Sequence, residues 1–445
     1  MLASLLKPAV AALVFHSAAA LPSWPPRDLN QVQVPVQEYK VSYDPRPFYL
    51  INTMTDSPLK TKLQSCENKP WSVTSFSIGH RGGGTLQFPE ETVESTVAGA
   101  RMGAGILECD VAFTADRGLV CRHSMCDLHT TTDILLRPEL AAKCTIPFRP
   151  AEGTLPATAL CCTSDITTDE FTTLCGKQDG FNASATSVQD YQHGTSDWRT
   201  DLYATCGTLM TLDSFITLVE SIPGRRNFTP ELKTPPGEIP MPFNGYTQEQ
   251  YARDMLDKFV ERGIAPERVW PQSFLPADIY QWIAEYPAFA KQAIFLDEDG
   301  DQPELMIKDI ARLQSLKDQG VNIISPPFGY LLSVADDNQT IIPSAYATTA
   351  REVGLDIIAW TYERSGPLAT IEARGEYYFG FIKDAVHTDG QYFEVLDVLA
   401  RQVGIKALFS DWSSTVSYYA NCFGLEYGGI HQVGQIQGGD TMSDG

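Results

Sequence analysis

Two histidines and two carboxylates lie in one short stretch of the chain at spacings that could support catalysis. His80 and Arg81 end one apolar run, and His123 ends another. Between them, Glu108 and Asp110 are two residues apart in the segment ILECD, so on a strand they project to the same face. Histidines transfer protons near neutral pH, and paired carboxylates bind hard cations. The stretch therefore predicts acid–base chemistry on a phosphate held beside a metal.

A third carboxylate, Glu231, shares a strand face with Lys233 in the segment FTPELK. Glu108, Asp110 and Glu231 would repel one another and raise one another's pKa unless a cation lay between them. Oxygen ligands favour one divalent cation, Ca²⁺ or Mg²⁺, over zinc. The alternative is that these groups are surface acids or salt-bridge partners, and that Lys233 only pairs with Glu231.

These residues resemble the motifs of the glycerophosphodiester phosphodiesterase family. The segments HRG (80–82), PEET (89–92), ECD (108–110) and HS (123–124) follow that family's order of HRG, PENT, Glu-x-Asp and His-Asp. Two positions differ from the family pattern. Glu91 replaces the asparagine of PENT, and Ser124 replaces the aspartate after the second histidine. We expect the first change to affect how the loop after Gly84 is held and the second to affect how His123 is oriented.

The resemblance implies a metal-dependent hydrolase that cleaves a small glycerophosphodiester to glycerol 3-phosphate and an alcohol. In that interpretation His80 and His123 transfer the protons, and Arg81 and Lys233 hold phosphate oxygens. Trp360, at a predicted strand end, would either stack on the glycerol or head group or only pack in the core. The alternatives are a phospholipase D-like or lysophospholipase D-like enzyme, or a non-catalytic binding protein. The sequence leaves open which histidine is the acid, whether a cyclic phosphate forms, the head group and the oligomeric state.

Alternating strands and helices must position these residues. The expected strands are 75–79, 106–114, 227–232, 269–274, 292–296, 322–325, 356–361 and 406–410. The expected helices between them are 90–102, 213–221, 247–263, 277–286, 304–319, 344–353 and 392–402. Eight such strands predict a parallel sheet closed as a (β/α)8 TIM barrel, which the resemblance also implies; a doubly wound open sheet is the alternative.

Residues 124–210 interrupt this alternation after the second strand. The chain has 10 cysteines, six of them from Cys126 to Cys206. No two have the spacing of a zinc knuckle, so disulfides are favoured over a zinc site. We therefore expect a disulfide-rich insertion, cross-linked chiefly within itself, that covers the rim of the barrel near the site.

The ends of the chain indicate secretion. Residues 1–20 resemble a signal peptide, with Lys7, a short apolar core and a small-residue cleavage site. Residues 21–74 are predicted to form an N-terminal arm, extended with one short helix, 75–425 the barrel domain and 426–445 a polar tail. Sequons at Asn182, Asn227 and Asn338 fit an extracellular protein. The net charge of -22 argues against a nucleic-acid partner, and no apolar run is long enough for a membrane anchor.

Overall fold

Parallel strands close into a barrel within the part of the chain that the structure describes. The computed structural model describes residues 41–203, 206–298, 310–374, 377–426 and 429–430. All of them belong to one unit, Val34–Gly445. The predicted signal peptide, residues 21–40 of the predicted arm, the start of the helix expected at 304–319 and most of the predicted tail lie outside the described residues.

The main sheet has the order β1-β15-β14-β11-β10-β9-β8-β2-β3, and β1 also pairs with β2. Because β3 (Leu119–Cys121) is antiparallel to β2, eight parallel strands form the closed barrel among the described residues. These are β1 (Thr74–Gly79), β2 (Ala104–Phe113), β8 (Asn227–Leu232), β9 (Gln272–Ser273), β10 (Ile294–Leu296), β11 (Ile323–Ser325), β14 (Asp356–Tyr362) and β15 (Ala407–Ser410). The predicted TIM barrel is confirmed, and an open sheet is excluded.

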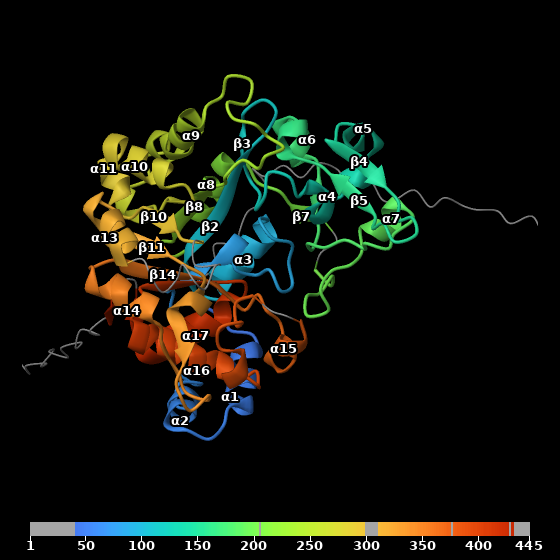
Figure 1. The fold of residues 1–445 in the computed structure, drawn as a ribbon. Helices are drawn as coiled ribbons and strands as arrows, with labels where there is room; N and C mark the ends of the chain where they lie inside the picture. Colours follow the sequence, from blue (N-terminus) through green and yellow to red (C-terminus); the bar gives the residue numbers. More distant parts are fainter. Residues whose placement is uncertain (1–40, 204–205, 299–309, 375–376, 427–428, 431–445) are drawn as a thin grey trace, which may run out of the picture. The chain divides into compact units, whose positions relative to one another are not determined.

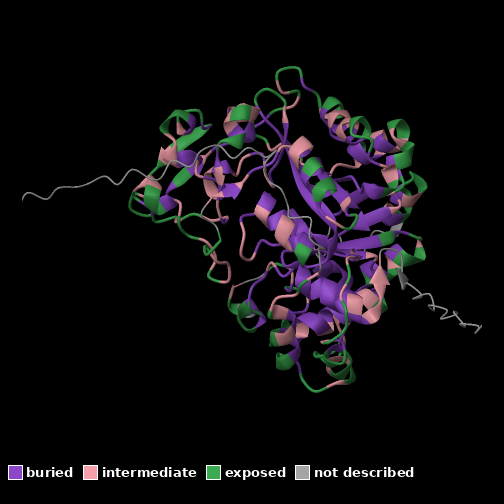
Figure 2. Ribbon diagram, turned by 180° about the vertical axis from the view of Figure 1, so that it is seen from behind, coloured by how far each residue is buried: buried purple, intermediate pink, exposed green. Residues whose placement is uncertain are grey.

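Apolar side chains from around the barrel form its core. Ile78 of β1, Ile106 of β2, Ile294 of β10 and Ile358 of β14 belong to one buried cluster, together with Phe409 of β15. Figure 2 shows the strands buried and the exposed residues concentrated on the outer helices and loops. Burying apolar surface stabilises a fold by about 25 cal/mol per Å². This core therefore stabilises the barrel and holds the ends of its strands in place.

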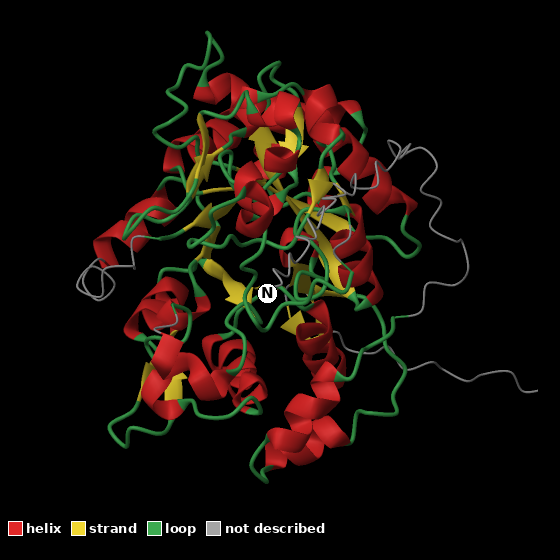
Figure 3. Cartoon of the chain, turned by 90° about the vertical axis from the view of Figure 1, so that its right-hand side faces the viewer, coloured by secondary structure: helices red, strands yellow, loops and turns green. Residues whose placement is uncertain are grey.

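Helices surround the strands (Figure 3). They are α3 (Val93–Arg101), α8 (Leu212–Ser221), α9 (Gln248–Glu261), α10 (Pro276–Glu285), α11 (Pro287–Ala290), α13 (Ile310–Asp318), α14 (Ala345–Glu352), α15 (Ile371–Arg374), α16 (Gln391–Asp397) and α17 (Ser413–Phe423). Threonine side chains cap several of them: Thr92 accepts a hydrogen bond from the Ser95 N–H, and Thr247 from the Gln250 N–H. Helix α3 begins at Val93 and not at the predicted residue 90, because Glu91 has a positive φ of 56°. Helix α17 was not predicted.

The segment before the barrel differs from the expected arm. It forms two helices, α1 (Arg46–Thr53) and α2 (Pro58–Gln64), which bury Leu50, Ile51 and Leu63. A disulfide between Cys66 and Cys422 joins this segment to α17. The prediction of an extended arm is therefore wrong for residues 41–66, because their apolar side chains pack against the last helices of the barrel.

The insertion is cross-linked within itself, as predicted. Disulfides join Cys126 to Cys162, Cys144 to Cys161 and Cys175 to Cys206, while Cys109–Cys121 joins β2 to β3. None of the ten cysteines is free, so the zinc alternative is excluded. The insertion's elements gather on one side in Figure 1: α4 (Leu128–Thr131), α5 (Pro138–Ala141), β4 (Ile146–Arg149), β5 (Thr158–Leu160), α6 (Thr168–Thr172), β6 (Cys175–Gly176), α7 (Val188–Tyr191) and β7 (Gly207–Thr208).

Two short antiparallel pairs complete the described elements. They are β12 (Leu332–Val334) with β13 (Ile341–Pro343), and β16 (Leu425–Glu426) with β17 (Gly429–Ile430). Among the described residues, none of the helices is both long and apolar enough to cross a bilayer.

Candidate active site

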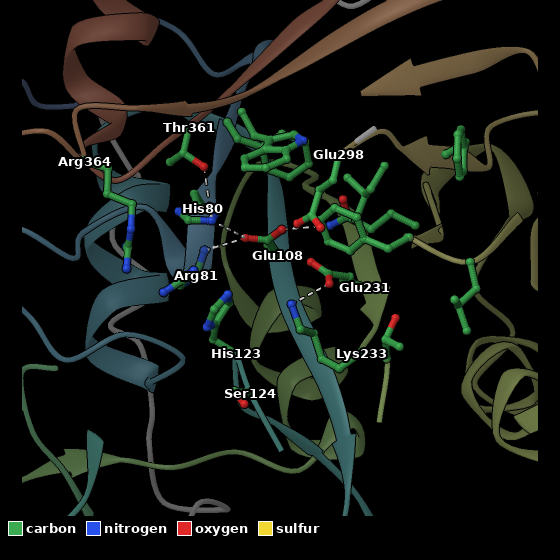
Figure 4. Close-up of a pocket in the computed structure, with 18 of the residues that line it drawn as sticks. His80, Arg81, Glu108, His123, Ser124, Glu231, Lys233, Glu298, Thr361 and Arg364 are labelled. Carbon is green, nitrogen blue, oxygen red and sulfur yellow. Dashed lines mark hydrogen bonds and ion pairs between the residues drawn. The ribbon is translucent and has the colours of Figure 1, made fainter. Parts of the chain in front are cut away.

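A cavity of about 930 Å³ opens where the barrel strands end. Seven of the eight predicted site residues line it: His80, Arg81, Glu108, His123, Glu231, Lys233 and Trp360. The eighth, Asp110, is 1% exposed and does not line the cavity. Figure 4 shows His80, Glu108 and Glu231 directed into the same space. The barrel thus brings together residues that the sequence separates by up to 280 positions.

His80 is held by a residue at the far end of the barrel domain. Its Nδ1 lies 2.5 Å from Oδ1 of Asp411, which directly follows β15. Burial alone would raise the pKa of Asp411, but the charges of Arg364, His80 and Arg199 hold it well below its usual range. The ionised carboxylate therefore accepts the Nδ1–H of His80. The other ring nitrogen, Nε2, lies 3.4 Å from the Thr361 hydroxyl and 4.0 Å from Glu108.

Burial lowers the pKa of His80 to about 4, although the charge of Asp411 opposes this shift. His123 is affected in the same direction: burial and the positive charges of Arg81 and Lys233 hold its pKa well below its usual value. Both imidazoles are therefore neutral at pH 7 in the absence of substrate. A neutral imidazole has a free nitrogen that can accept a proton.

Asp127 lies close to Ser124, the residue that stands where the family motif has an aspartate after its second histidine. Its Oδ2 accepts the backbone N–H of Ser124 at 2.9 Å. Potential ligand atoms of Asp127, His123 and Glu90 all lie within 4.8 Å of one another. Burial raises the pKa of Asp127 to about 7, against the charge of Arg122. A carboxyl group is thus present beside His123, although it comes from three residues farther along the chain than Ser124.

The predicted metal ligands form a buried acidic group. Glu108 accepts the Arg81 N–H at 2.6 Å and the Gln272 side-chain amide at 2.8 Å. Glu231 pairs with Lys233 at 2.5 Å, as the salt-bridge alternative expected. Burial, and then the charges of Asp110 and Glu231, raise the pKa of Glu108 well above its usual value. Burial likewise raises the pKa of Glu231 to about 8, against the effect of Lys233.

The oxygens of Asp110 fit a cation. Both are buried, and no nitrogen or hydroxyl donor of a described residue lies within hydrogen-bond distance of them. The carboxyl groups of Glu91 and Glu231 lie beside them and can donate only when they are protonated. The nearest cationic partners of the Asp110 oxygens, Arg81 Nε and Lys233 Nζ, lie 3.7 and 4.0 Å away, beyond hydrogen-bond distance. Buried carboxylate oxygens without donors are costly, and a divalent cation would remove that cost. The donor set is entirely oxygen, which suits Ca²⁺ or Mg²⁺.

Glu91, which replaces the asparagine of the family's PENT motif, lies beside the predicted metal ligands. Oxygens of Glu91, Glu108 and Asp110 all lie within 4.8 Å of one another. One oxygen of Glu91 accepts the backbone N–H of Asp110 at 3.2 Å, and the other is buried without a hydrogen-bond partner. Burial and the charges of Asp110 and Glu108 raise the pKa of Glu91 well above its usual value. The substitution therefore adds a fourth carboxylate beside the predicted ligands.

The arginines at the site are arranged around two carboxylates. Arg81 pairs with Glu90 at 2.9 Å. Arg364 lies 3.8 Å from Glu90 and 3.0 Å from Asp411, and it also lines the cavity. Burial would raise the pKa of Glu90, but the charges of Arg81 and Arg364 lower it to about 2. Arg81 and Arg364 thus place two guanidinium groups on the cavity wall, where they can contact a phosphate group.

Trp360 is packed against its neighbours and also lies on the cavity wall. Its indole N–H donates to the Ser325 carbonyl at 2.7 Å, and its ring packs edge-on against Phe274 and Tyr378. It is half-buried and lines the cavity. Trp360 is thus a packed wall residue whose ring also borders the space open to a ligand.

The sequence did not single out several residues that contact the site. They are Glu90, Asp127, Arg199, Gln272, Arg364 and Asp411. Gln272, Arg364 and Asp411 lie on or just after a barrel strand, and position at a strand end was the available signal for them. Arg199 lies in the insertion, and no pattern in the sequence marked it.

Comparison with known proteins agrees with this geometry. A model of the "Glycerophosphoryl diester phosphodiesterase family" matches residues 80–412. A protein of Arthroderma benhamiae named "Extracellular protein" is 45% identical over 249 residues, which is 56% of this chain and 100% of that protein. "Glycerophosphodiester phosphodiesterase GDPD6" of Arabidopsis thaliana is 22% identical, over 84% of this chain and 91% of its own.

A solved structure supports the same fold. It is a protein of Silicibacter pomeroyi DSS-3 assigned to the glycerophosphoryl diester phosphodiesterases, with a TM-score of 0.51 and 17% identity. The match covers 82% of this chain and 99% of that one. Since the family model matches more than half of the 445 residues, the chain belongs to the glycerophosphoryl diester phosphodiesterase family.

Proposed function

We propose that this protein hydrolyses glycerophosphodiesters to glycerol 3-phosphate and an alcohol, with His80 and His123 as the proton-transfer pair. One observation carries the proposal: Asp411 binds Nδ1 of His80, which leaves Nε2 for a cavity that His123 also lines. Family membership supports phosphodiester hydrolysis. The name of the Arabidopsis relative supports the glycerophosphodiester class of substrate.

The two histidines would divide the proton transfers between them. One takes the proton of the attacking hydroxyl, and the other donates a proton to the leaving alcohol. A bound phosphodiester is an anion, so it would raise the pKa of a nearby histidine and allow that ring to carry the proton. His80, with Nε2 unprotonated, is prepared to accept a proton first. The nucleophile is water or the substrate's own 2-hydroxyl.

Glu108, Asp110 and Glu231 would hold one divalent cation, Ca²⁺ or Mg²⁺, and Glu91 is close enough to add a ligand. When bound, such an ion neutralises charge that builds up on the phosphorus oxygens. Arg81 and Lys233 line the cavity and would hold phosphate oxygens. Trp360 would border the glycerol or the head group.

Secretion is part of the proposal. Five disulfides suit an oxidising compartment, and a relative bears the name "Extracellular protein". The net charge of -22 fits a small-molecule substrate and not a nucleic acid. Of the three sequons, Asn338 is exposed, whereas Asn227 lies on barrel strand β8. We therefore expect glycosylation at Asn338 before Asn227.

The decisive experiment measures glycerol 3-phosphate released from glycerophosphocholine and glycerophosphoethanolamine by the purified protein, with and without a chelator. Lysophosphatidylcholine is tested in parallel by the choline that it releases, because its cleavage leaves an acylated glycerol phosphate. Apolar residues such as Phe274 and Phe295 also line the cavity and could accept its acyl chain. Chelator-sensitive release from the glycerophosphodiesters is the expected result. Turnover of the lysolipid alone would favour a lysophospholipase D-like enzyme. Turnover of none of them would mean that the protein is not a phosphodiesterase for these substrates.

A further inference from the structure

One arginine of the disulfide-rich insertion, Arg199, contacts a carboxylate at the end of the barrel. Arg199 lies in the loop that the Cys175–Cys206 disulfide closes. Its Nη2 donates to Oδ2 of Asp411 at 2.6 Å, and its Nη1 donates to the carbonyl of Thr85 at 3.3 Å. The side chain is only 6% exposed. An arginine buried to this degree, with its charge paired to one carboxylate, differs from an ordinary surface arginine.

Arg199 and His80 share the Asp411 carboxylate through different oxygens. Oδ1 faces Nδ1 of His80 at 2.5 Å, and Oδ2 accepts from Arg199. A carboxylate can rotate about its Cβ–Cγ bond, which would move both oxygens together. A charge-assisted hydrogen bond on Oδ2 opposes that rotation and so keeps Oδ1 aimed at the imidazole. The orientation of the His80 ring therefore depends on what holds the second oxygen.

Arg364 also contacts Oδ2 of Asp411 but is less suited to holding this carboxylate in place. Its Nη1 lies 3.0 Å from Oδ2 of Asp411, and its Nη2 also lies 3.8 Å from Glu90. The side chain of Arg364 is 21% exposed and lines the substrate cavity, so a phosphate can compete for it. Arg199 is not among the described residues that line that cavity. Arg199 can thus hold Asp411 whether or not substrate is bound.

The residues on both sides of Arg199 are hydrogen-bonded to barrel loops. The indole N–H of Trp198 donates to the carbonyl of Arg364 at 3.2 Å. On the other side, the N–H of Thr200 donates to the carbonyl of Leu86 at 3.1 Å. A site gains precision when the groups behind it are held in this way.

We propose that Arg199 is a positioning residue, through which the insertion holds Asp411 and thereby keeps the His80 ring in the orientation that turns Nε2 toward the substrate. The proposal rests on the function proposed above for His80. It gives the insertion a role in catalysis. Arg199 itself touches neither substrate nor reacting atoms.

Kinetics of three variants test this role. In Arg199→Ala we expect kcat to fall about 10- to 100-fold, the range typical of groups that orient an active residue, with KM nearly unchanged. Arg199→Lys keeps a positive charge and should recover part of kcat. The matched control is Arg149→Ala, which removes an exposed arginine of the insertion, on β4. An unchanged kcat in Arg199→Ala, or a raised KM with normal kcat, would overturn the proposal.

A second readout does not depend on activity. Nitrogen NMR of histidine-labelled protein at pH 7 distinguishes the two neutral ring tautomers, and His80→Gln assigns the signals. In the unaltered protein and in Arg149→Ala we expect His80 to carry its proton on Nδ1. In Arg199→Ala, verified as folded by circular dichroism, we expect a mixture of tautomers. Unchanged His80 signals there would refute the role of Arg199. If the unaltered protein hydrolyses no glycerophosphodiester but the His80 signals still change, only the proposed function has failed.

Discussion

The imidazole of His80 and the carboxylate of Asp411 lie in hydrogen-bond contact, 2.5 Å apart, although 331 positions separate them in the chain. The contact exists because β1 and β15 are neighbours in the closed barrel, with Gly79 opposite Ser410. The residues that follow these two strands, His80 and Asp411, therefore emerge side by side. In the proposed reaction Asp411 fixes which ring nitrogen of His80 is free, as the aspartate of a catalytic triad does for its histidine.

The first prediction concerns the two histidines. His80→Ala and His123→Ala should each lower turnover of glycerophosphocholine by about 10²–10⁴-fold, with little change in substrate binding. The double variant should lose less than the product of the two single effects, because the groups act in one step. His387→Ala, at an exposed histidine, is the matched control. Near-normal turnover in both single variants would contradict the mechanism.

The second prediction concerns the metal. Asp110→Asn keeps the size of the side chain but removes the charge of a buried carboxylate that no nitrogen or hydroxyl donor of the described residues reaches. Isothermal titration with Ca²⁺ and with Mg²⁺ should show weaker binding in this variant, and its thermal unfolding in a chelator should match that of the unaltered protein. Asp116→Asn, at a carboxylate on the β2–β3 turn, serves as the control. If Asp110→Asn binds the metal as tightly as the unaltered protein, Asp110 is not a metal ligand.

The third prediction concerns Asp127. If this carboxyl group orients His123 in place of the family's aspartate, then Asp127→Asn should lower kcat by about 10-fold. Adding a carboxylate by Ser124→Asp in the unaltered protein should give no gain, since the position beside His123 is already occupied. In the Asp127→Asn background, Ser124→Asp should restore part of the rate. Higher activity from Ser124→Asp alone would show that Asp127 does not perform this role.

The fourth prediction concerns pH and stability in the insertion. His129 of the insertion is only partly exposed, and its Nδ1 accepts the Cys161 N–H at 3.3 Å. Burial lowers its pKa from 6.5 to about 4, so the folded protein binds fewer protons than the unfolded chain between these values. Its contribution to stability is fully present above pH 6.5 and is lost as pH falls toward 4.

Chemical denaturation at pH 7 and pH 4.5 checks this sign. The free energy of unfolding should decrease at the lower pH, and the decrease should be smaller by about 1–2 kcal/mol in His129→Gln, a figure reduced because the ring is partly exposed. The difference between the two proteins isolates His129 from other titrating groups. Identical decreases would show that the pKa of His129 is not shifted.

The fifth prediction concerns the disulfide that closes the loop carrying Arg199. Replacing Cys175 and Cys206 with serine should lower the free energy of unfolding by about 3–4 kcal/mol, for a sequence separation of 31. It should also lower kcat, because the loop that positions Arg199 becomes less ordered. The matched change at Cys144 and Cys161 should reduce stability but leave kcat unaffected. If kcat is the same in both double variants, the Cys175–Cys206 disulfide does not contribute to the active site.

Local patterns in the sequence were enough to predict the barrel. Strand-length apolar runs alternated with amphipathic helices, and strand periodicity placed Glu108 beside Asp110 and Glu231 beside Lys233. Cysteine density marked the insertion, and its six cysteines do pair among themselves. These features are local, because each depends on residues close together in the chain.

Which distant groups surround the histidines depends on how the chain folds in three dimensions. Closure of the barrel brings Asp411 to His80, and the packing of the insertion adds Arg199 to that carboxylate. Because Glu91 has a positive φ, α3 begins later than predicted. The side chain of Glu91 lies beside the buried carboxyl groups of Glu108 and Asp110. Such contacts follow from barrel closure and loop packing between segments far apart in sequence, and no local periodicity encodes them.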